Sequence, residues 1–207
     1  MAELPMFPLG MVLLPGGVLP LHVFEPRYRQ LVVDCLSDDG EPEFGQALIT
    51  HGSEAGGGDE RALVGTVAQM IQVEALDDDR YALVTVGTRR IRINAWLPDD
   101  PYPIADVEDW PDSSPDAPGL DDAVTSSHAR VRAALALAAE LGDVSAEVVD
   151  SDISTDPLVA SYHLAALAPI GPADRYRLLT ASGPADRLAV LDEVLDDVEA
   201  MLKFRLT

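Results

Sequence analysis

The N-terminal stretch "LPMFPLGMVLLPGGVLPLHVFEPRYRQLV", residues 4–32, decides how the first half of this 207-residue chain folds. Its apolar runs are interrupted by prolines and glycines, at positions 5, 8, 10, 15, 16, 17 and 20. Proline removes a backbone donor and clashes with the preceding helical turn, so these residues exclude a continuous helix. We therefore predict a strand over residues 7–14 that is broken at Pro8, a turn at residues 15–17 and extended chain over residues 18–23.

The same stretch lacks the features of an export signal or a membrane anchor. A signal peptide carries basic residues ahead of its apolar run, but the only charge before Leu4 is Glu3. A membrane-spanning helix needs about 20 apolar residues without helix breakers. We expect the run to form part of the core of a soluble, cytoplasmic protein, in which the single cysteine, Cys35, is a small buried apolar side chain.

The chain is strongly acidic, with 36 Asp and Glu against 14 Lys and Arg and a formal net charge of −22. Such a field repels phosphate backbones and anionic lipids, so nucleic acids and membranes are not predicted partners. The only dense basic segment is "TRRIRI", residues 88–93. Because the acids are spread along the chain, they favour general solubility or adaptation to a salty cytoplasm over an acidic-tail function.

One helix is predicted directly after the N-terminal stretch. Its sequence "PRYRQLVVDC" repeats apolar residues with the helical period of about 3.6, from Pro26 to a stop at residues 38–40. Its buried face is expected to hold Tyr28, Leu31, Val32, Cys35 and Leu36. A strand over residues 43–50 and a mobile, glycine-rich hairpin loop over residues 51–60 should follow.

Residues 61–95 carry the clearest strand signal. Two long runs of β-branched and apolar residues flank Asp77–Asp79, which predicts a hairpin. The segment "RRIRINAW" then alternates arginine with isoleucine, which predicts one buried and one solvated face. An irregular last strand is expected around residues 104–107.

The remainder of the chain is predicted to be helical. The proline-rich segment "PDSSPDAPG" has no apolar periodicity, so we divide the chain into a β-rich region over residues 1–110, a linker over 111–119 and a helical region over 120–207. The first helix of this region should end at Gly142 and bury Val124, His128, Val131, Leu135 and Ala138. Proline near the start predicts three further helices, and the last should bury Leu188, Leu191, Leu195, Val198 and Leu202.

Several classes of catalytic site are excluded by residues that the sequence does not contain. Lys203 is the only lysine, so neither a GxxxxGK[ST] phosphate loop nor a plausible serine–lysine dyad is present. There is no GxSxG elbow, and the four histidines form no HxH or HxxxH pair. We therefore predict no catalytic residue, metal or cofactor.

The order of features resembles the N-terminal, substrate-binding domain of the ATP-dependent Lon protease along nearly the whole chain. The most specific matches are Leu4–Leu9, Pro20–Leu21, the segment "VGTV" from Val64, and Gly87 followed by Arg90, Arg92 and Ile93. The segment "FEPRY", Phe24 to Tyr28, looks more like free-standing members of this family than like the domain fused to the protease.

The resemblance implies an α+β fold, with an N-terminal rolled, mostly antiparallel β domain that embeds a helix, followed by a C-terminal α-helical bundle. It also implies recognition of proteins, since this region of the full-length protease engages substrates and helps to assemble the ring. No catalytic residue carries over, because the catalytic machinery of the family lies in other domains.

Our leading hypothesis is a non-enzymatic protein-binding module, an adaptor or regulator of proteolysis, with unfolded or partly folded polypeptides and a protease as partners. The candidate binding residues form two groups: His22, Phe24, Glu25, Arg27 and Tyr28, and Arg89, Arg90 and Arg92. Each has a structural alternative, since Arg27 could pair with an internal acid and the arginines could lie on an ordinary wet strand. The alternative functions are a hydrolase or small-ligand-processing enzyme with an unrecognised site, and a structural protein that self-associates through its helices.

The placement of the N-terminal run in the core yields a first prediction. Leu14→Asp should unfold the β-rich region, because an isolated charge in an apolar core is too costly to bury. Thermal unfolding followed by circular dichroism measures this effect, and a variant with the stability of the parent protein would refute the placement.

Overall fold

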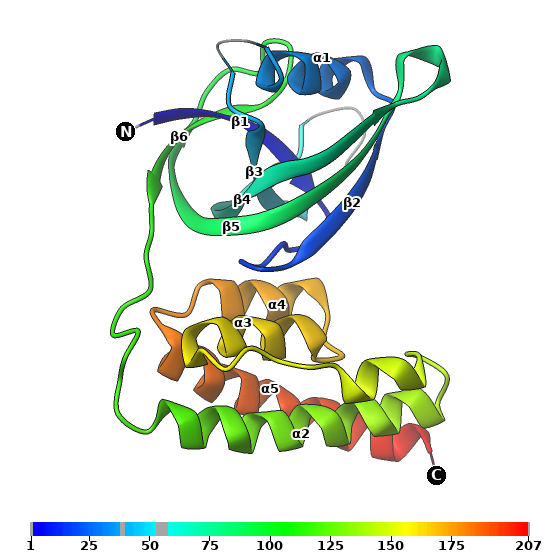
Figure 1. The fold of residues 1–207 in the computed structure, drawn as a ribbon, viewed down its shortest axis with the longest axis vertical. Helices are drawn as coiled ribbons and strands as arrows, with labels where there is room; N and C mark the ends of the chain where they lie inside the picture. Colours follow the sequence, from blue (N-terminus) through cyan, green and yellow to red (C-terminus); the bar gives the residue numbers. More distant parts are fainter. Residues whose placement is uncertain (1, 38–39, 53–57, 207) are drawn as a thin grey trace. The chain divides into compact units, whose positions relative to one another are not determined.

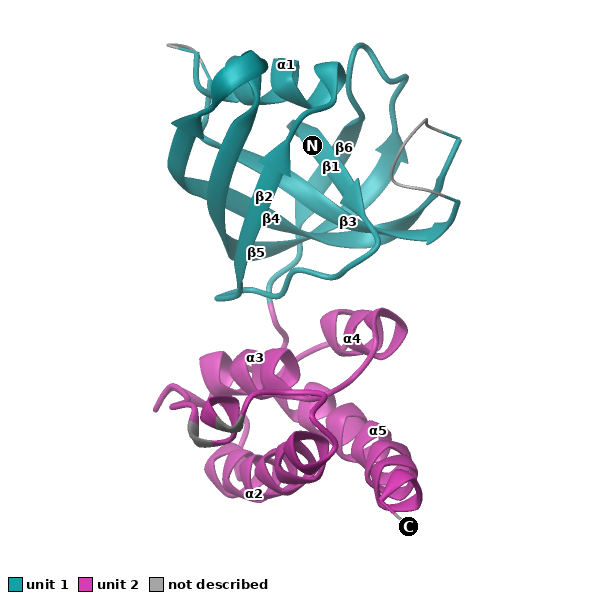
Figure 2. Cartoon of the chain, turned by 90° about the vertical axis from the view of Figure 1, so that its right-hand side faces the viewer, with its two compact units in different colours: residues 1–111 teal, residues 112–207 magenta. Residues whose placement is uncertain are grey.

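The computed structural model describes residues 2–37, 40–52 and 58–206. The chain divides into two compact units, Met1–Pro111 and Asp112–Thr207, shown in different colours in Figure 2. The first unit contains a curled sheet and the second consists of helices, as expected for an α+β fold. Residues 53–57 of the predicted mobile loop lie outside the described residues.

The strands of the first unit form a single six-stranded sheet (Figure 1). They are β1 (Ala2–Leu9), β2 (Val18–Val23), β3 (Glu43–His51), β4 (Glu60–Ala75), β5 (Tyr81–Trp96) and β6 (Ile104–Asp109). Their order is β2-β5-β4-β3-β1-β6, and β5 also pairs with β6, so the sheet closes into a barrel that β2 extends from one edge of β5. β1 and β3 are parallel and the other described pairs are antiparallel, which confirms the rolled, mostly antiparallel sheet.

Much of the N-terminal stretch is buried, including Val12, Leu13 and Leu14, but its first strand lies elsewhere than predicted. β1 ends at Leu9, and the chain then runs irregularly to β2. Leu13 donates its N–H to Gln46 Oε1 at 2.9 Å, and its carbonyl accepts from Thr66 Oγ1 at 2.7 Å. The predicted strand is therefore wrong beyond Leu9, because buried side chains and not a neighbouring strand satisfy this backbone. Leu14 itself is 2% exposed, as the core placement requires.

The embedded helix α1 (Pro26–Cys35) lies across one end of the curled sheet (Figure 1). Its buried residues are Tyr28, Leu31, Val32 and Cys35, which belong to the same apolar cluster as residues of β1 and β2. The helix ends before the predicted stop, and Leu36 is 45% exposed instead of buried. The helical periodicity thus predicted the buried face except at its last residue.

The second unit contains four α-helices and a short 3-10 helix. They are α2 (Leu120–Glu140), the 3-10 helix Ala146–Asp150, α3 (Pro157–Leu167), α4 (Pro172–Leu179) and α5 (Pro184–Arg205). Gly142, with φ of 77°, follows the end of α2 as predicted. The predicted buried residues of α5 are all buried, whereas Val124 and His128 of α2 are only half-buried.

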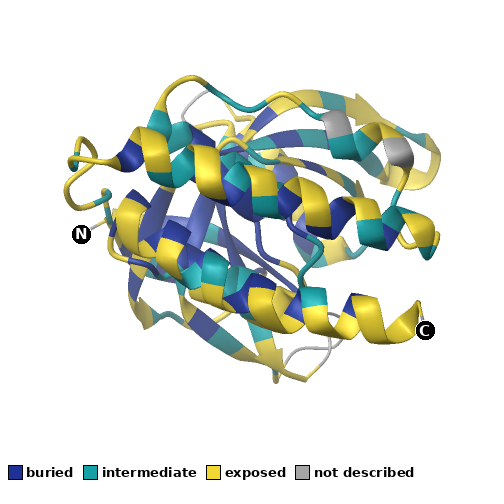
Figure 3. Cartoon of the chain, turned by 90° about the horizontal axis from the view of Figure 1, so that it is seen from below, coloured by how far each residue is buried: buried dark blue, intermediate teal, exposed yellow. Residues whose placement is uncertain are grey.

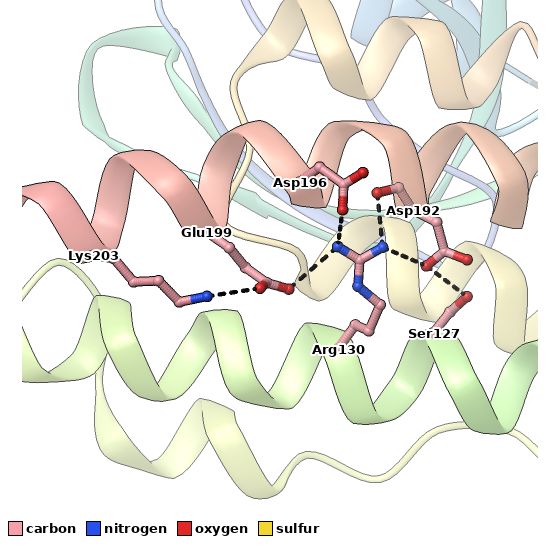
Figure 4. Close-up of polar contacts among 6 residues, drawn as sticks. All are labelled: Ser127, Arg130, Asp192, Asp196, Glu199 and Lys203. Carbon is pink, nitrogen blue, oxygen red and sulfur yellow. Dashed lines mark hydrogen bonds and ion pairs between the residues drawn. The ribbon is translucent and has the colours of Figure 1, made fainter.

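Buried positions recur along both α2 and α5, as the view in Figure 3 shows. The two helices are also joined by Arg130 of α2, which contacts three acidic residues of α5 (Figure 4). Its guanidinium lies 2.6 Å from Asp196 Oδ1 and 3.3 Å from Glu199 Oε1, and it donates to the carbonyl oxygen of Asp192 at 2.9 Å. A cation at this point offsets the mutual repulsion of the acids on α5.

A second arginine of the helical unit, Arg187, is fully buried. It contacts Asp112 Oδ1 at 2.5 Å and donates to Ser161 Oγ at 2.8 Å and to the carbonyl of Leu178 at 3.3 Å. Its guanidinium also lies 3.6 Å from the centre of the Tyr162 ring. The start of the predicted linker is therefore anchored to the helical unit by an ion pair.

This ion pair should contribute strongly to the stability of the helical unit. Arg187→Met should lower the free energy of unfolding by roughly 3–5 kcal/mol, because the Asp112 carboxylate, 9% exposed, loses its cationic partner. Arg177, whose side chain is 52% exposed, provides the control, and Arg177→Met should cost less than about 1 kcal/mol. Urea denaturation of the two variants measures both values, and equal losses would contradict the assigned role.

Candidate functional site

The curled sheet is open between the ends of β1 and β2. On β1, the ladder with β6 covers only Ala2–Pro5. β2 pairs with β5 along the edge of β2 that faces away from β1. A cavity of about 230 Å³ lies at this opening, lined by Phe7–Leu9 of β1, Leu21–Glu25 at the end of β2, and Tyr28 of α1. Consecutive strand residues point to opposite faces, so a cavity lined by such runs follows the strand edges. We call this cavity and its lining residues the seam.

The edge of β1 presents almost no hydrogen-bond donors to the seam. Met6 donates its N–H to the carbonyl oxygen of Pro103 at 2.8 Å, on the side of β6. The N–H and C=O groups of a strand residue share a direction that alternates along the chain, so Pro8 directs its backbone to the same side. Proline has no N–H, and this position therefore offers only a carbonyl oxygen.

At the edge of β2, one residue near the cavity offers both a backbone N–H and a backbone C=O. The carbonyl of Gly17 accepts from the N–H of Gly87 on β5 at 2.9 Å, which fixes the direction of that carbonyl toward β5. By the same alternation, Pro20 and His22 direct their backbone groups away from β5. Pro20 offers a carbonyl alone, whereas His22 offers both an N–H and a C=O.

The floor of the seam is apolar and its rim is exposed. Phe7, Leu9, Val23 and Tyr28 are buried, and the rings of Phe7 and Tyr28 stack with centroids 3.9 Å apart. Phe24, at the rim, is 64% exposed. An exposed aromatic side chain beside an apolar cavity is a usual feature of surfaces that bind other molecules.

The first group of predicted binding residues lies together at the seam. His22, Phe24, Glu25 and Tyr28 line the cavity, and Arg27 lies beside it. Arg27 Nε is 3.1 Å from Glu25 Oε2, and its guanidinium is 4.5 Å from the centre of the Tyr28 ring. Arg27 therefore pairs with an internal acid, Glu25, as its structural alternative required.

β1 contributes residues to this site that were not predicted from the sequence. Phe7 and Leu9 form part of the floor of the seam, although they lie some 15 residues from the candidates that the sequence suggested. The available signal was the pair Pro8 and Pro20, because proline within a strand is typical of an edge.

The arginines of the second group do not share one face. Arg89 forms a two-pronged contact with the carboxylate of Glu43, at 2.7 and 2.9 Å, and also contacts Asp109 at 2.9 Å. Arg90 and Arg92 instead lie over the ring of Trp110, at 4.4 and 4.3 Å from its centre.

The prediction of a solvated arginine face is wrong for Arg90, which is 3% exposed. Its side chain is covered by Trp110, which follows β6, and the backbone N–H of that tryptophan donates to the Arg90 carbonyl at 2.9 Å. The aromatic ring faces the guanidinium group and lowers the cost of burying its charge, so Arg90 can occupy a buried position on β5.

A larger cavity of about 710 Å³ contains polar groups that an enzyme could use, including Asp34, Cys35 and Tyr102. Tyr102 donates its hydroxyl to Asp34 Oδ2 at 2.8 Å, and Cys35 Sγ donates to the carbonyl of Glu43 at 3.4 Å. Burial raises the pKa of the Cys35 thiol to about 12, with nearby Asp34 and Glu43 adding to the effect. This thiol is therefore neutral near pH 7, which is the unreactive form.

Two of the histidines, His51 and His163, likewise make ordinary structural contacts. His51 Nδ1 is 3.1 Å from Glu60 Oε2 with both side chains largely exposed, and His163 Nδ1 accepts from the Ser154 N–H at 3.2 Å. Within residues 2–37, 40–52 and 58–206, no three His, Cys, Asp or Glu side chains are grouped to hold a metal ion. No helix in the same ranges has the length and apolar character needed to cross a membrane.

Comparison with known proteins identifies the family. Residues 3–197 match the ATP-dependent protease La (LON) substrate-binding domain. The chain belongs to this family. A Lon protease of Anaeromyxobacter dehalogenans is 33% identical over 115 residues, and Lon protease 2 of Myxococcus xanthus is 32% identical over 106 residues. These matches cover 55% and 51% of this chain but only 13% of each protease, so the chain spans a small part of the relatives it matches.

Solved structures resemble this Lon-type chain over nearly its whole length. The crystal structure of a Lon N-terminal domain protein from Xanthomonas campestris is 27% identical, with a TM-score of 0.68, and the match covers 92% of this chain and 97% of that one. The N-terminal domain of Mycobacterium avium complex Lon protease shares the fold with a TM-score of 0.64 at 19% identity, covering 95% and 99%. The predicted family and fold class are both confirmed.

The Tyr28 hydroxyl and the Cys35 thiol, both buried in the first unit, should make the folded protein less stable at alkaline pH. Burial raises the pKa of Tyr28 to about 12, as it does for Cys35, whereas the unfolded values are about 10 and about 8.5. The unfolded chain therefore loses these protons first, and the stability they contribute is complete below about pH 8.5 and is lost as the pH rises toward about 12.

Urea denaturation at increasing pH measures this loss, with Tyr28→Phe as the control for the phenol. The phenylalanine variant should lose less stability over the same pH range because it retains the ring without the titrating hydroxyl. Identical pH profiles for the two proteins would show that Tyr28 titrates normally when folded.

Proposed function

We propose that this chain is a non-enzymatic polypeptide-binding module whose binding site is the seam. The observation that carries the proposal is the apolar cavity between the open edges of β1 and β2, with the exposed ring of Phe24 at its rim. An apolar floor, an exposed aromatic side chain and unpaired strand edges are suited to an extended, partly apolar segment of another protein.

Membership of the LON substrate-binding family supports a role in binding polypeptides. The relatives that carry this domain are Lon proteases, so the proposed clients are unfolded or partly folded chains in the cytoplasm. In this proposal the module acts as an adaptor or regulator of proteolysis and presents captured segments to a protease. Recognition by the seam requires no cofactor.

Removing the exposed aromatic side chain should weaken binding without unfolding the protein. Phe24→Ala is expected to reduce the affinity for a fluorescently labelled, permanently unfolded polypeptide by about tenfold, because an aromatic anchor contributes on the order of 1–2 kcal/mol. Fluorescence anisotropy measures the affinity, and an unlabelled folded protein serves as a competitor that should not displace the labelled chain.

Phe204 supplies a matched control because it is 81% exposed and lies in the other unit, on α5. Phe204→Ala should bind the unfolded chain like the parent protein. Equal weakening by both substitutions would indicate non-specific apolar adhesion, and an absence of binding by the parent protein at high concentration would contradict the proposed function.

A further inference from the structure

The backbone edge of β2 has an irregular set of hydrogen-bonding groups. Alternation along β2 directs Val18, Pro20 and His22 away from β5, and the middle one of these is a proline. Pro8 on the facing edge of β1 also lacks an N–H. His22 is therefore the residue beside the cavity that offers a complete donor and acceptor pair to a visiting chain.

The size and the lining of the seam favour an extended segment over a helix. A helix is about 10 Å wide and its backbone groups are bonded to one another, so it could not use the free groups of Pro20 and His22. The cavity of about 230 Å³ between two strand edges is matched instead to one large apolar side chain of an extended chain. Strand addition places alternate side chains on opposite faces of the sheet.

The outer face at the same edge is exposed at Val18, Pro20 and His22 of β2. His22 pairs with Ala82 of β5, and Ala82 pairs in turn with Glu74 of β4, so Glu74 lies two strands away from the free edge. A strand added to β2 would direct one side chain into the apolar cavity and the next to the outer face beside His22. The formal net charge of −22 favours a basic residue at this second position, because it attracts cationic segments and repels anionic ones.

We propose that polypeptides bind by adding a strand to the free edge of β2, anchored by the backbone of His22. The segment that fits is extended and alternates an apolar residue, which enters the seam, with a basic residue, which points to the exposed outer face and is favoured by the net charge of −22. This inference rests on the proposed function and adds to it the binding mode and the class of sequence that is recognised.

Backbone methylation of a peptide tests the binding mode directly on the parent protein. The probe is a short labelled peptide that alternates leucine and lysine, with single N-methyl groups placed in turn along its backbone. Methylation at positions that pair with His22 should lower the affinity about tenfold or more, and methylation one residue away should be tolerated, giving an alternating pattern.

Substitutions of His22 test the anchor from the side of the protein. His22→Pro removes the N–H that points away from β5, so the sheet ladder survives while binding of the leucine–lysine peptide falls about tenfold. His22→Ala keeps the N–H and should bind like the parent protein. Thermal unfolding checks that both variants fold. If the proline variant does not fold, the methylated peptides alone test strand addition at His22.

A second peptide tests the charge selectivity. A leucine–glutamate peptide should bind poorly to the parent protein, because the net charge of −22 repels it, and equal binding of the two peptides would contradict the preference for basic residues. If the unfolded polypeptide binds but methylation has no alternating effect, strand addition is overturned while the proposed function stands. If neither the unfolded polypeptide nor the peptide binds, the proposed function itself fails.

Discussion

The form of the β unit depends on how the polar backbone between β1 and β2 is buried. This connection is strongly apolar and runs through the core, yet it forms no regular ladder, so its N–H and C=O groups need partners from elsewhere. Gln46, 1% exposed, supplies both: its Oε1 accepts from Leu13 and its Nε2 donates to the Met11 carbonyl at 2.7 Å. Thr66 Oγ1 donates to the Leu13 carbonyl, and the Gly87 carbonyl accepts from the Gly16 N–H at 2.8 Å. An added Cβ at Gly87 would overlap the Leu14 carbonyl oxygen.

Because the connection is held in this way, β1 and β2 never meet as a hairpin. β1 pairs with β3 and β6, β2 pairs with β5, and the two strands face each other only across the seam. The opening therefore results from the order of the strands, and it is not a gap left by a small side chain. Side chains of α1 fill the interior behind it, which gives the opening a solid apolar floor.

The sequence predicted those features that depend on local periodicity. The period of about 3.6 located α1 and α5 together with their buried faces, and the aspartates at Asp77–Asp79 located the turn between β4 and β5. The extent of β1 was misjudged because Leu13 is satisfied by side chains more than 30 residues away, which no local pattern reveals.

The candidate site was predictable only in part, for a related reason. Residues 22–28 are contiguous and mix apolar with polar side chains, so they could be chosen from the sequence. The burial of Arg90 depends on Trp110, and the ion pairs of Arg89 depend on Glu43 and Asp109, which the fold brings together from separate strands. Alternation along a strand correctly separates two faces but cannot show whether a neighbouring aromatic ring covers one of them.

Pro8 and Pro20, on the facing edges of β1 and β2, reconcile an open strand edge with protection against uncontrolled pairing. An unpaired edge is a template for uncontrolled pairing between chains, and proline limits this hazard by removing donors. At Pro8 and Pro20 only carbonyl oxygens remain, so another edge cannot form a continuous ladder there. In the proposed binding mode, a visiting chain still bonds to His22 and buries a side chain against Phe7 and Tyr28. Such a site favours short contacts of modest strength, which a module must be able to release if it passes captured segments to another protein.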